Sequence, residues 1–153
     1  MAMRPHSTSG AERTFAVITF FDVFARYAES VASAIVKECL GNDLGTPQTY
    51  VAAATAAGLL VVAYYKRGGI RGWYERDTDG RECLYYNTAY TVDTQARVLV
   101  HERAHSLIAE RERDMYPESM PPAVIAGYDD SLYSDEAHRL CRRVERLVVG
   151  ENR

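Results

Sequence analysis

The chain has 153 residues, of which 47% are hydrophobic and 25% charged, and its formal net charge at pH 7 is -3. This length allows one domain with a proper core and hardly two. The small negative charge gives no bulk electrostatic case for direct binding of nucleic acid. The apolar stretch 51–65 is shorter than the roughly 20 residues that a transmembrane helix needs, so we expect no membrane association.

The cysteines indicate a reducing compartment. Cys39, Cys83 and Cys141 are odd in number, lie far apart and form no C-x-x-C pair, which is typical of free thiols rather than of a disulfide framework. The apolar run 15–21 looks like a secretory signal only superficially, because charged residues soon interrupt it. We therefore expect a cytoplasmic protein.

In chain order, the sequence begins with a polar segment, 1–13, which we expect to be a disordered leader. The remaining residues, 14–153, are predicted to form a single domain. Within this domain an additional N-terminal helix, in 14–45, precedes a catalytic core at 46–149.

Apolar residues in the segment 14–45 recur at steps of three and four, which predicts a long amphipathic helix. They are Val17, Phe20, Phe21, Phe24, Tyr27, Ala28, Val31, Ile35 and Cys39. Gly41 and Asn42 form a suitable stop for this helix. An aromatic stripe of this kind is more often core than binding surface, but it would also suit a homodimer interface.

Thr46 and Pro47 predict the start of a second helix, with Thr46 as the N-cap and Pro47 in the first helical position. Gly58 is expected to end it. Three β-favouring segments then predict strands at 59–65, 72–76 and 82–86. Between the last two lies a D-G pair of the kind that closes hairpins.

The segment 97–113 contains the candidate catalytic and metal-binding residues. It reads as an amphipathic helix with Asp93 as a plausible N-cap, and it contains an H-E-x-x-H motif formed by His101, Glu102 and His105. Positions i and i+4 of a helix share one face, so the two imidazoles converge on one point, which is half of a tetrahedral zinc site. Glu102 is then placed to take a proton from a metal-bound water rather than to bind the metal.

A motif of this length also arises by chance, and a histidine on an apolar face is more often a satisfied core residue. In this helix, however, two histidines and a glutamate would be costly to bury without a partner. The context therefore favours a metal site.

A loop at 114–133, broken by prolines, follows the motif helix, and a loop of this length in a compact domain is often an active-site wall or lid. Ser134 is expected to cap a last helix. The apolar face of that helix is predicted to consist of Ala137, Leu140, Cys141, Val144, Leu147 and Val148. Its arginines, Arg139, Arg142, Arg143 and Arg146, are expected to form a solvated face. The element order predicts a small α+β domain in which a three-stranded sheet packs against four helices, with the motif helix in the centre.

A catalytic zinc needs a third protein ligand and an open position. Glu136 is the first candidate, because it lies roughly 85° from the centre of the apolar face, at the inner edge of the last helix's first turn. His138 lies on the other flank, roughly 115° away. Since zinc accepts nitrogen or oxygen, His138 and the loop residue Asp129 remain alternatives. A purely structural role for Glu136, complementing the dipole of the helix N-terminus, also remains open.

The motifs resemble those of the ImmA/IrrE metallopeptidases. The sequence order G-W-Y-E-R, L-Y-Y-N, V-L-V-H-E-R-A-H-S-L-I and S-D-E-A-H-R-L-C-R-R-V is similar to the strands, motif helix and later helix of that family, over 46–149. The resemblance implies a zincin-like fold in which His101, His105 and Glu136 bind the metal. It implies that Glu102 is the catalytic base. It also implies a protein substrate, a helix-turn-helix DNA-binding repressor that is cleaved in a stress or mobile-element response.

Three positions depart from the family pattern. Ala104 stands where the family has glycine, Arg103 where it has leucine, and His138 where it has Asp or Asn. Arg103 is expected to place a charge near the cleft and to influence which substrate enters.

Together these features predict a gluzincin-like zinc endopeptidase with Zn2+ as cofactor, or alternatively Mn2+ or another divalent ion. A second oxyanion donor or second-shell group is expected from His138 or from one of three tyrosines, Tyr116, Tyr128 and Tyr133. One alternative is a non-catalytic interaction module in which His138 completes a closed structural zinc site. Another is a toxin-like protease encoded beside its own repressor.

Overall fold

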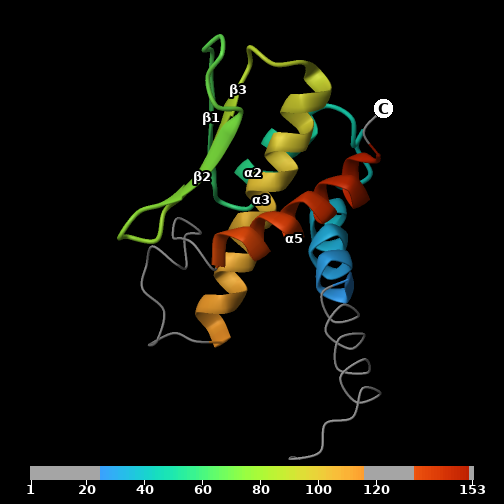
Figure 1. The fold of residues 1–153 in the computed structure, drawn as a ribbon, viewed down its shortest axis with the longest axis vertical. Helices are drawn as coiled ribbons and strands as arrows, with labels where there is room; N and C mark the ends of the chain where they lie inside the picture. The colour runs from blue at the N-terminus through green and yellow to red at the C-terminus, as the bar shows by residue number, and fades with distance from the viewer. Residues whose placement is uncertain (1–24, 116–132, 152–153) are drawn as a thin grey trace, which may run out of the picture.

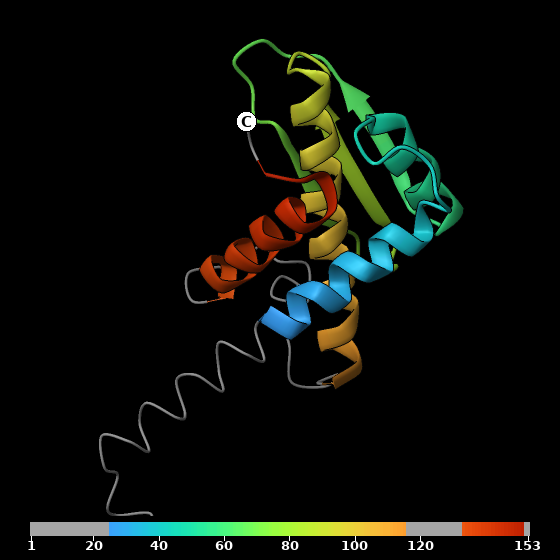
Figure 2. The ribbon, with the colours of Figure 1, turned by 90° about the vertical axis from the view of Figure 1, so that its right-hand side faces the viewer.

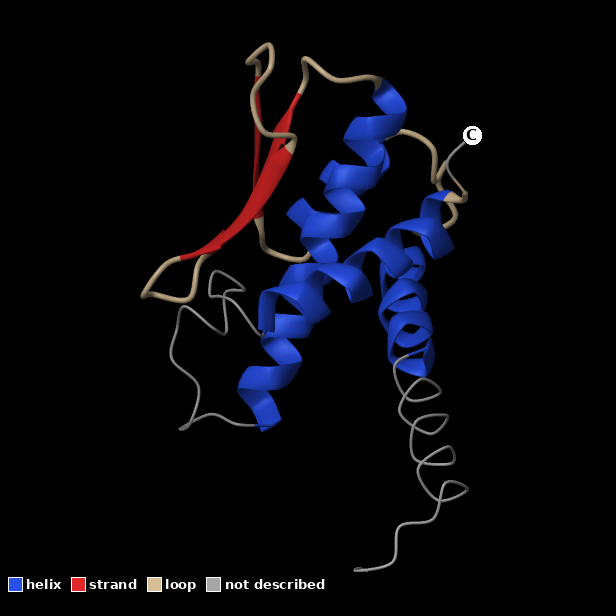
Figure 3. Cartoon of the chain, in the orientation of Figure 1, coloured by secondary structure: helices blue, strands red, loops and turns tan. Residues whose placement is uncertain are grey.

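The computed structural model describes residues 25–115 and 133–151. This part of the chain contains four helices and a three-stranded mixed sheet (Figures 1 and 3), which confirms the predicted α+β domain. In chain order the elements are a first helix at 25–38, α2 (Pro47–Ala56), β1 (Leu60–Tyr64), β2 (Gly72–Arg76), β3 (Glu82–Asn87), α3 (Val92–Met115) and α5 (Tyr133–Val149). The predicted leader 1–13, the first part of the N-terminal helix and residues 116–132 of the predicted loop lie outside the described residues.

The motif helix α3 is the centre of the fold, as predicted. It contacts α2, α5, β2 and β3, and Figures 1 and 2 show the first helix on the side of α3 that faces away from the sheet. A helix that is enclosed in this way buries polar side chains as well as apolar ones. The directions of those polar side chains therefore decide which of them reach the candidate site and which bind the surrounding elements.

The sheet has the strand order β1-β3-β2. β1 runs parallel to β3, whereas β2 and β3 form the predicted antiparallel hairpin. In the hairpin loop the Asp77 carboxylate accepts hydrogen bonds from the backbone N–H groups of Asp79, at 3.0 Å, and Arg81, at 2.8 Å. Gly80 takes a positive φ of 85° there, which a glycine adopts without steric cost. This order leaves β2 at an edge of the sheet, next to α3.

Asn87, at the end of β3, fixes both connections around the sheet. Its buried side chain accepts hydrogen bonds from the N–H groups of Lys66 and Ala89, at 3.1 and 3.0 Å. The same amide donates to the carbonyls of Lys66 and Ile70, at 2.8 and 3.1 Å. One side chain thus holds the β1–β2 connection against the turn that leads into α3. Through its bond to Ile70 it also fixes the position of the next residue, Arg71.

The helix starts agree only partly with the sequence. Thr46 has extended backbone before Pro47, as predicted, but its hydroxyl contacts that of Thr49 at 3.1 Å and caps no backbone N–H. The prediction of Asp93 as N-cap of the motif helix was wrong. Thr91 has this role, because its hydroxyl accepts a hydrogen bond from the N–H of Thr94 at 3.2 Å. Asp93 instead lies inside the first turn of α3.

One hydrophobic core joins the first helix, α3 and α5. Its buried residues include Ala28, Val31, Ile35 and Cys39 from the first helix, Leu99, Val100, Ala104 and Ile108 from α3, and Leu140, Cys141, Val144 and Val148 from α5. Leu147 was wrongly predicted on the apolar face of α5, since 42% of it is exposed. The first helix is therefore an integral part of this core. Homodimerisation through it stays a prediction.

Arg103 is buried, and it points away from the cleft in which we expected it. Its guanidinium forms a bidentate ion pair with Glu38 of the first helix, with Nε 3.1 Å from Oε2. Its Nη1 donates to Ser106 Oγ at 2.9 Å, and Ser106 Oγ donates to Glu82 of β3 at 2.6 Å. The unusual arginine inside the motif therefore ties the first helix and the sheet to α3, and the expectation that it meets the substrate is corrected.

The three cysteines carry free thiols, and burial raises the pKa of Cys39 and, more strongly, of Cys141. Among the helices of the described residues, none combines the length and the apolar composition that crossing a bilayer requires. The cytoplasmic location stays a prediction.

Gly72 allows β2 to lie close to α3. A Cβ atom at this position would lie 2.4 Å from the carbonyl oxygen of Tyr85 and 2.5 Å from Cγ1 of Val98. Gly72→Ala should therefore push β2 away from α3 and lower the free energy of unfolding by about 1–3 kcal/mol, the usual cost of overpacking. Urea denaturation measures this. Gly69→Ala is the control, because its nearest neighbours are flexible side-chain atoms of Lys66. Equal midpoints for the two variants would contradict the close approach.

The Arg103–Glu38 pair generates a second prediction. Glu38→Met should leave the buried guanidinium without its counter-ion and cost about 2 kcal/mol, whereas Arg103→Met together with Glu38→Met should restore part of that loss. Urea denaturation of the two single variants and the double variant gives the coupling energy. Arg143→Met, at an exposed position of α5, is the control for removal of an arginine. Strictly additive effects of the two substitutions would refute the role of the pair.

Candidate metal centre

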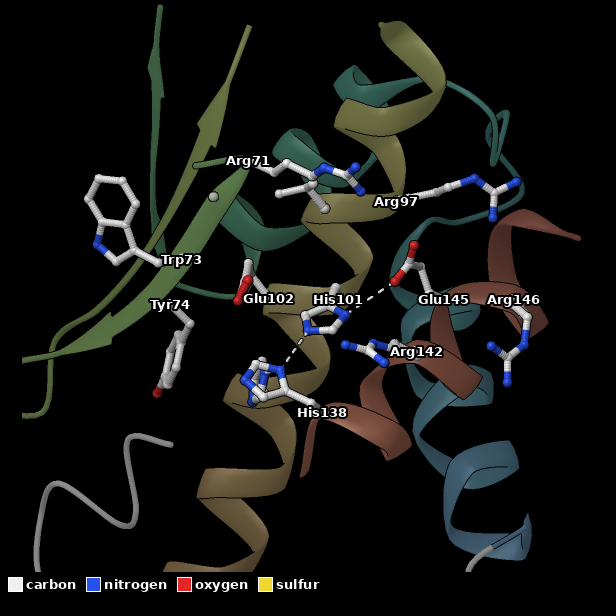
Figure 4. A pocket seen from close by; sticks show the side chains of 13 residues that line it. Arg71, Trp73, Tyr74, Arg97, His101, Glu102, His138, Arg142, Glu145 and Arg146 are labelled. Carbon is white, nitrogen blue, oxygen red and sulfur yellow. Dashed lines mark hydrogen bonds and ion pairs between the residues drawn. The ribbon is translucent and has the colours of Figure 1, made fainter. Parts of the chain in front are cut away.

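Three imidazoles from two helices meet at one point. His101 and His105 lie one turn apart on α3, and His138 comes from α5 (Figure 4). His138 Nδ1 lies 3.3 Å from His101 Nε2 and 3.4 Å from His105 Nε2. One nitrogen from each of the three rings lies within 4.8 Å of the others, close enough for the three histidines to bind one metal ion.

These spacings suit a common ion better than hydrogen bonds alone. Donor atoms that lie about 2.0–2.1 Å from a tetrahedral ion are about 3.3–3.4 Å from each other, which matches the two measured separations. A ring nitrogen of a neutral imidazole carries either one proton or one lone pair. The Nδ1 atom of His138 therefore cannot satisfy two neighbouring Nε2 atoms equally well, whereas a single cation satisfies all three.

Glu145 fixes the orientation of the first histidine. The Nδ1 atom of His101 lies 3.1 Å from Glu145 Oε2, so Nδ1–H donates to the carboxylate and Nε2 keeps its lone pair for the point where the rings meet. Metal-binding histidines commonly hold a carboxylate in this way, which sets the tautomer and raises the basicity of the ligating nitrogen. His101 thus has the arrangement of a metal ligand on both of its nitrogens.

Burial controls the protonation of the other two motif residues. Burial, followed by the charges of His101 and His138, lowers the pKa of His105 to about 3, so this imidazole is neutral and able to ligate at pH 7. Burial raises the pKa of Glu102 to about 7, with His101 opposing and Glu145 reinforcing the rise. A carboxylate with a pKa near neutrality is suited to take up and release a proton.

A cavity of about 520 Å³ adjoins the histidines. Its walls come from α3, from α5 and from the edge strand β2, and Glu102 lines it together with all three histidines. Figure 4 shows His101 of α3 facing His138 and Glu145 of α5, whereas the side chain of Glu102 lies on the side of α3 next to β2. A small substrate segment in the cavity would therefore lie against both the metal centre and the edge of the sheet.

The structure brings together His101 and His105 as predicted, and it adds His138, which the sequence offered as an alternative third ligand. The side chains of Glu136 and Tyr133 lie outside the described residues, as do Tyr116, Tyr128 and Asp129, so their roles stay predictions. Sequence reasoning did not foresee that Glu145 would contact His101. The spacing of seven residues from His138 would have placed it on the same face of the last helix.

The chain matches no protein-family model, no curated protein and no solved structure. The resemblance to the ImmA/IrrE metallopeptidases stays a prediction, and the argument for function comes from the site.

The raised pKa of Glu102 predicts a pH-dependent loss of stability in the metal-free protein. Below about pH 4.5 the Glu102 carboxyl is protonated in both the folded and the unfolded state, so its burial does not lower the free energy of unfolding. Between its ordinary pKa of 4.5 and the folded value of about 7, the folded state binds more protons, so stability falls as the pH rises. Above pH 7 the full cost is about 3 kcal/mol.

In the presence of a chelator, Glu102→Gln should therefore stabilise the protein by up to about 3 kcal/mol at pH 8, and by close to nothing at pH 4. Chemical denaturation at the two pH values measures this difference. Glu29→Gln, at an exposed position of the first helix, should show no such dependence. A Glu102→Gln variant that is equally stable to wild type at pH 8 would show that the folded carboxyl ionises freely.

Proposed function

We propose that this protein is a zinc-dependent endopeptidase. The observation that carries the proposal is the convergence of His101, His105 and His138 beside a cavity that Glu102 also lines. Three protein ligands with space next to them are the usual composition of a catalytic zinc site, whereas structural sites have four. The described residues supply three such donors.

The donor set favours zinc among the divalent ions. Three imidazole nitrogens form a borderline-soft ligand set that suits zinc, whereas manganese prefers carboxylate and carbonyl oxygen. Mn2+ or another divalent ion remains the alternative cofactor, because affinity alone does not decide which metal a protein acquires in the cell.

A zinc ion in this site would make a water molecule acidic and polarise the scissile carbonyl. With such an ion bound, Glu102 would be the group that accepts a proton from the attacking water and returns it to the departing amine. Burial, which raises the pKa of this carboxyl in the metal-free protein, favours the proton uptake that this role needs. The hydrogen bond from His101 to Glu145 keeps the first ligand in its ligating tautomer throughout.

The position of β2 favours a peptide as substrate. In the described part of the chain β2 pairs only with β3, so its other edge presents unpaired backbone groups, and Gly72, Trp73 and Tyr74 of this strand line the cavity. An extended peptide can add to such an edge through main-chain hydrogen bonds. A helix-turn-helix repressor as the natural substrate is part of the proposal and rests on the resemblance alone.

The first experiment is metal analysis of the purified protein and of two ligand variants. Wild type should hold about one zinc per chain, and His138→Ala should lose most of it, since loss of a ligand removes a third of the described donor set. Glu136→Ala should keep the metal, and so should Arg139→Ala, a control at an exposed position of α5. Glu102→Gln should also keep zinc but should not hydrolyse peptides.

Each other result has a distinct meaning. Loss of zinc from Glu136→Ala but not from His138→Ala would make Glu136 the third ligand, as the resemblance implies. Loss from both variants would indicate a closed four-ligand site and favour the alternative function, a non-catalytic interaction module with structural zinc. A metal-free wild type, even after zinc is supplied, would refute the metal centre.

A further inference from the structure

Basic side chains dominate the walls of the cavity. Although the whole chain has a net charge of -3, four arginines line this one space: Arg71, Arg97, Arg142 and Arg146. The acidic residues that line it are Glu102 and Glu145. Glu145 already accepts a hydrogen bond from His101, and the pKa of Glu102 is raised by burial. A bound divalent ion would add further positive charge.

Arg97 does not contribute a free charge. Its Nε donates to Asp93 at 2.8 Å, and its terminal nitrogens donate to the carbonyls of Gly150 and Glu151 at 2.7 and 3.3 Å. These bonds anchor the end of α5 to α3. Its role is therefore structural.

Among the described residues, the other three arginines form no ion pair with a carboxylate. Arg71 lies over the ring of Tyr90, with its guanidinium carbon 5.7 Å from the ring centroid. Within residues 25–115 and 133–151, neither Arg142 nor Arg146 has an ion pair with Asp or Glu. Three guanidinium groups thus keep their hydrogen-bonding capacity available toward the cavity.

Helix geometry places two of these arginines on the same side as the metal centre. Arg142 follows His138 by four residues, and Arg146 follows Arg142 by four, so the three form a row along one face of α5. Figure 4 shows Arg142 reaching toward the imidazoles of His101 and His138. All four arginines of this helix are exposed, but Arg139 and Arg143, unlike Arg142 and Arg146, do not line the cavity.

We propose that this cavity selects peptides carrying a carboxylate beside the scissile bond, with Arg142 and Arg146 as the residues that determine this specificity and Arg71 on the opposite wall. The inference rests on the proposed peptidase function and names its substrate class. A guanidinium offers a planar fork of N–H donors that matches a carboxylate with two parallel hydrogen bonds.

The test compares zinc-loaded wild type on three pools of octapeptides. The first pool is acetylated and amidated and is rich in Asp and Glu. The second is identical except that every Asp and Glu is Asn or Gln. The third has the neutral sequences with a free C-terminal carboxylate. Wild type should cleave the acidic pool with a kcat/KM at least about tenfold above that for the neutral blocked pool, as expected for a charge-assisted hydrogen bond.

The variants test which arginines are responsible. Arg142→Gln combined with Arg146→Gln should remove most of this preference, measured as the ratio of kcat/KM for the acidic pool to kcat/KM for the neutral blocked pool. Arg139→Gln combined with Arg143→Gln removes the same charge from positions of the same helix that do not line the cavity, and it should keep the wild-type preference. Equal cleavage of acidic and neutral pools by wild type, or an unchanged preference in the Arg142–Arg146 variant, would overturn the inference.

The third pool identifies the source of the carboxylate. If neutral peptides with a free C-terminus are cleaved with the same kcat/KM as the acidic pool, the arginines recognise the terminal carboxylate. Cleavage near the end of the peptide would then support carboxylate recognition by these arginines. A preference confined to the amidated acidic pool assigns the recognised group to Asp and Glu side chains.

A binding measurement separates this inference from the peptidase function. Calorimetric titration of zinc-loaded Glu102→Gln with one acidic octapeptide and its neutral counterpart needs no hydrolysis. Binding that favours the acidic peptide about tenfold, and that loses this preference when Arg142 and Arg146 are also replaced by Gln, supports the inference even if no pool is cleaved. Equal affinity for both peptides overturns it, whether or not the protein is a peptidase.

Discussion

The structure depends on the burial of polar side chains along one central helix. Glu102, Arg103, His105 and Ser106 of α3 are all buried, and a buried polar group costs free energy unless it finds a partner. The surrounding elements provide partners in two different directions. His105 turns toward α5 and His138, while Arg103 and Ser106 turn toward the first helix and β3. These four side chains thus fix the positions of the neighbouring elements as well as the site.

The hydrogen bonds around Arg103 extend through the sheet to the wall of the cavity. From Glu38 of the first helix, hydrogen bonds lead through Arg103 and Ser106 to Glu82 of β3, whose carboxylate also accepts a bond from the hydroxyl of Tyr74. Tyr74 belongs to β2 and lines the cavity. The first helix, which the family resemblance leaves unexplained, therefore supports the wall of the cavity through a continuous set of contacts. Its role in this core is structural, whatever else it binds.

The second helix of the site, α5, packs into the core with one face and lines the cavity with another. Leu140, Cys141, Val144 and Val148 are buried in the core, while the face next to the cavity carries His138 and Glu145 beside two arginines. Core packing thereby sets the rotation of α5 about its axis. This rotation decides that His138 meets the motif histidines and that Glu145 reaches His101. A site that depends on packed core residues is held more rigidly than one built from loops.

The sequence by itself determined the elements and the motif, because helical and strand periodicity and turn residues are local properties of the chain. The spacing of His101 and His105 alone guarantees that they share a face, and the D-G hairpin formed as predicted. Only the tertiary structure decided the strand order, the inward turn of Arg103 toward Glu38, and the meeting of His138 and Glu145 with the motif across more than 30 residues of chain. The helical angle of a residue specifies a face, but the neighbour on that face is set by long-range packing. For this reason the third histidine was one alternative among several in the sequence and a defined contact in the fold.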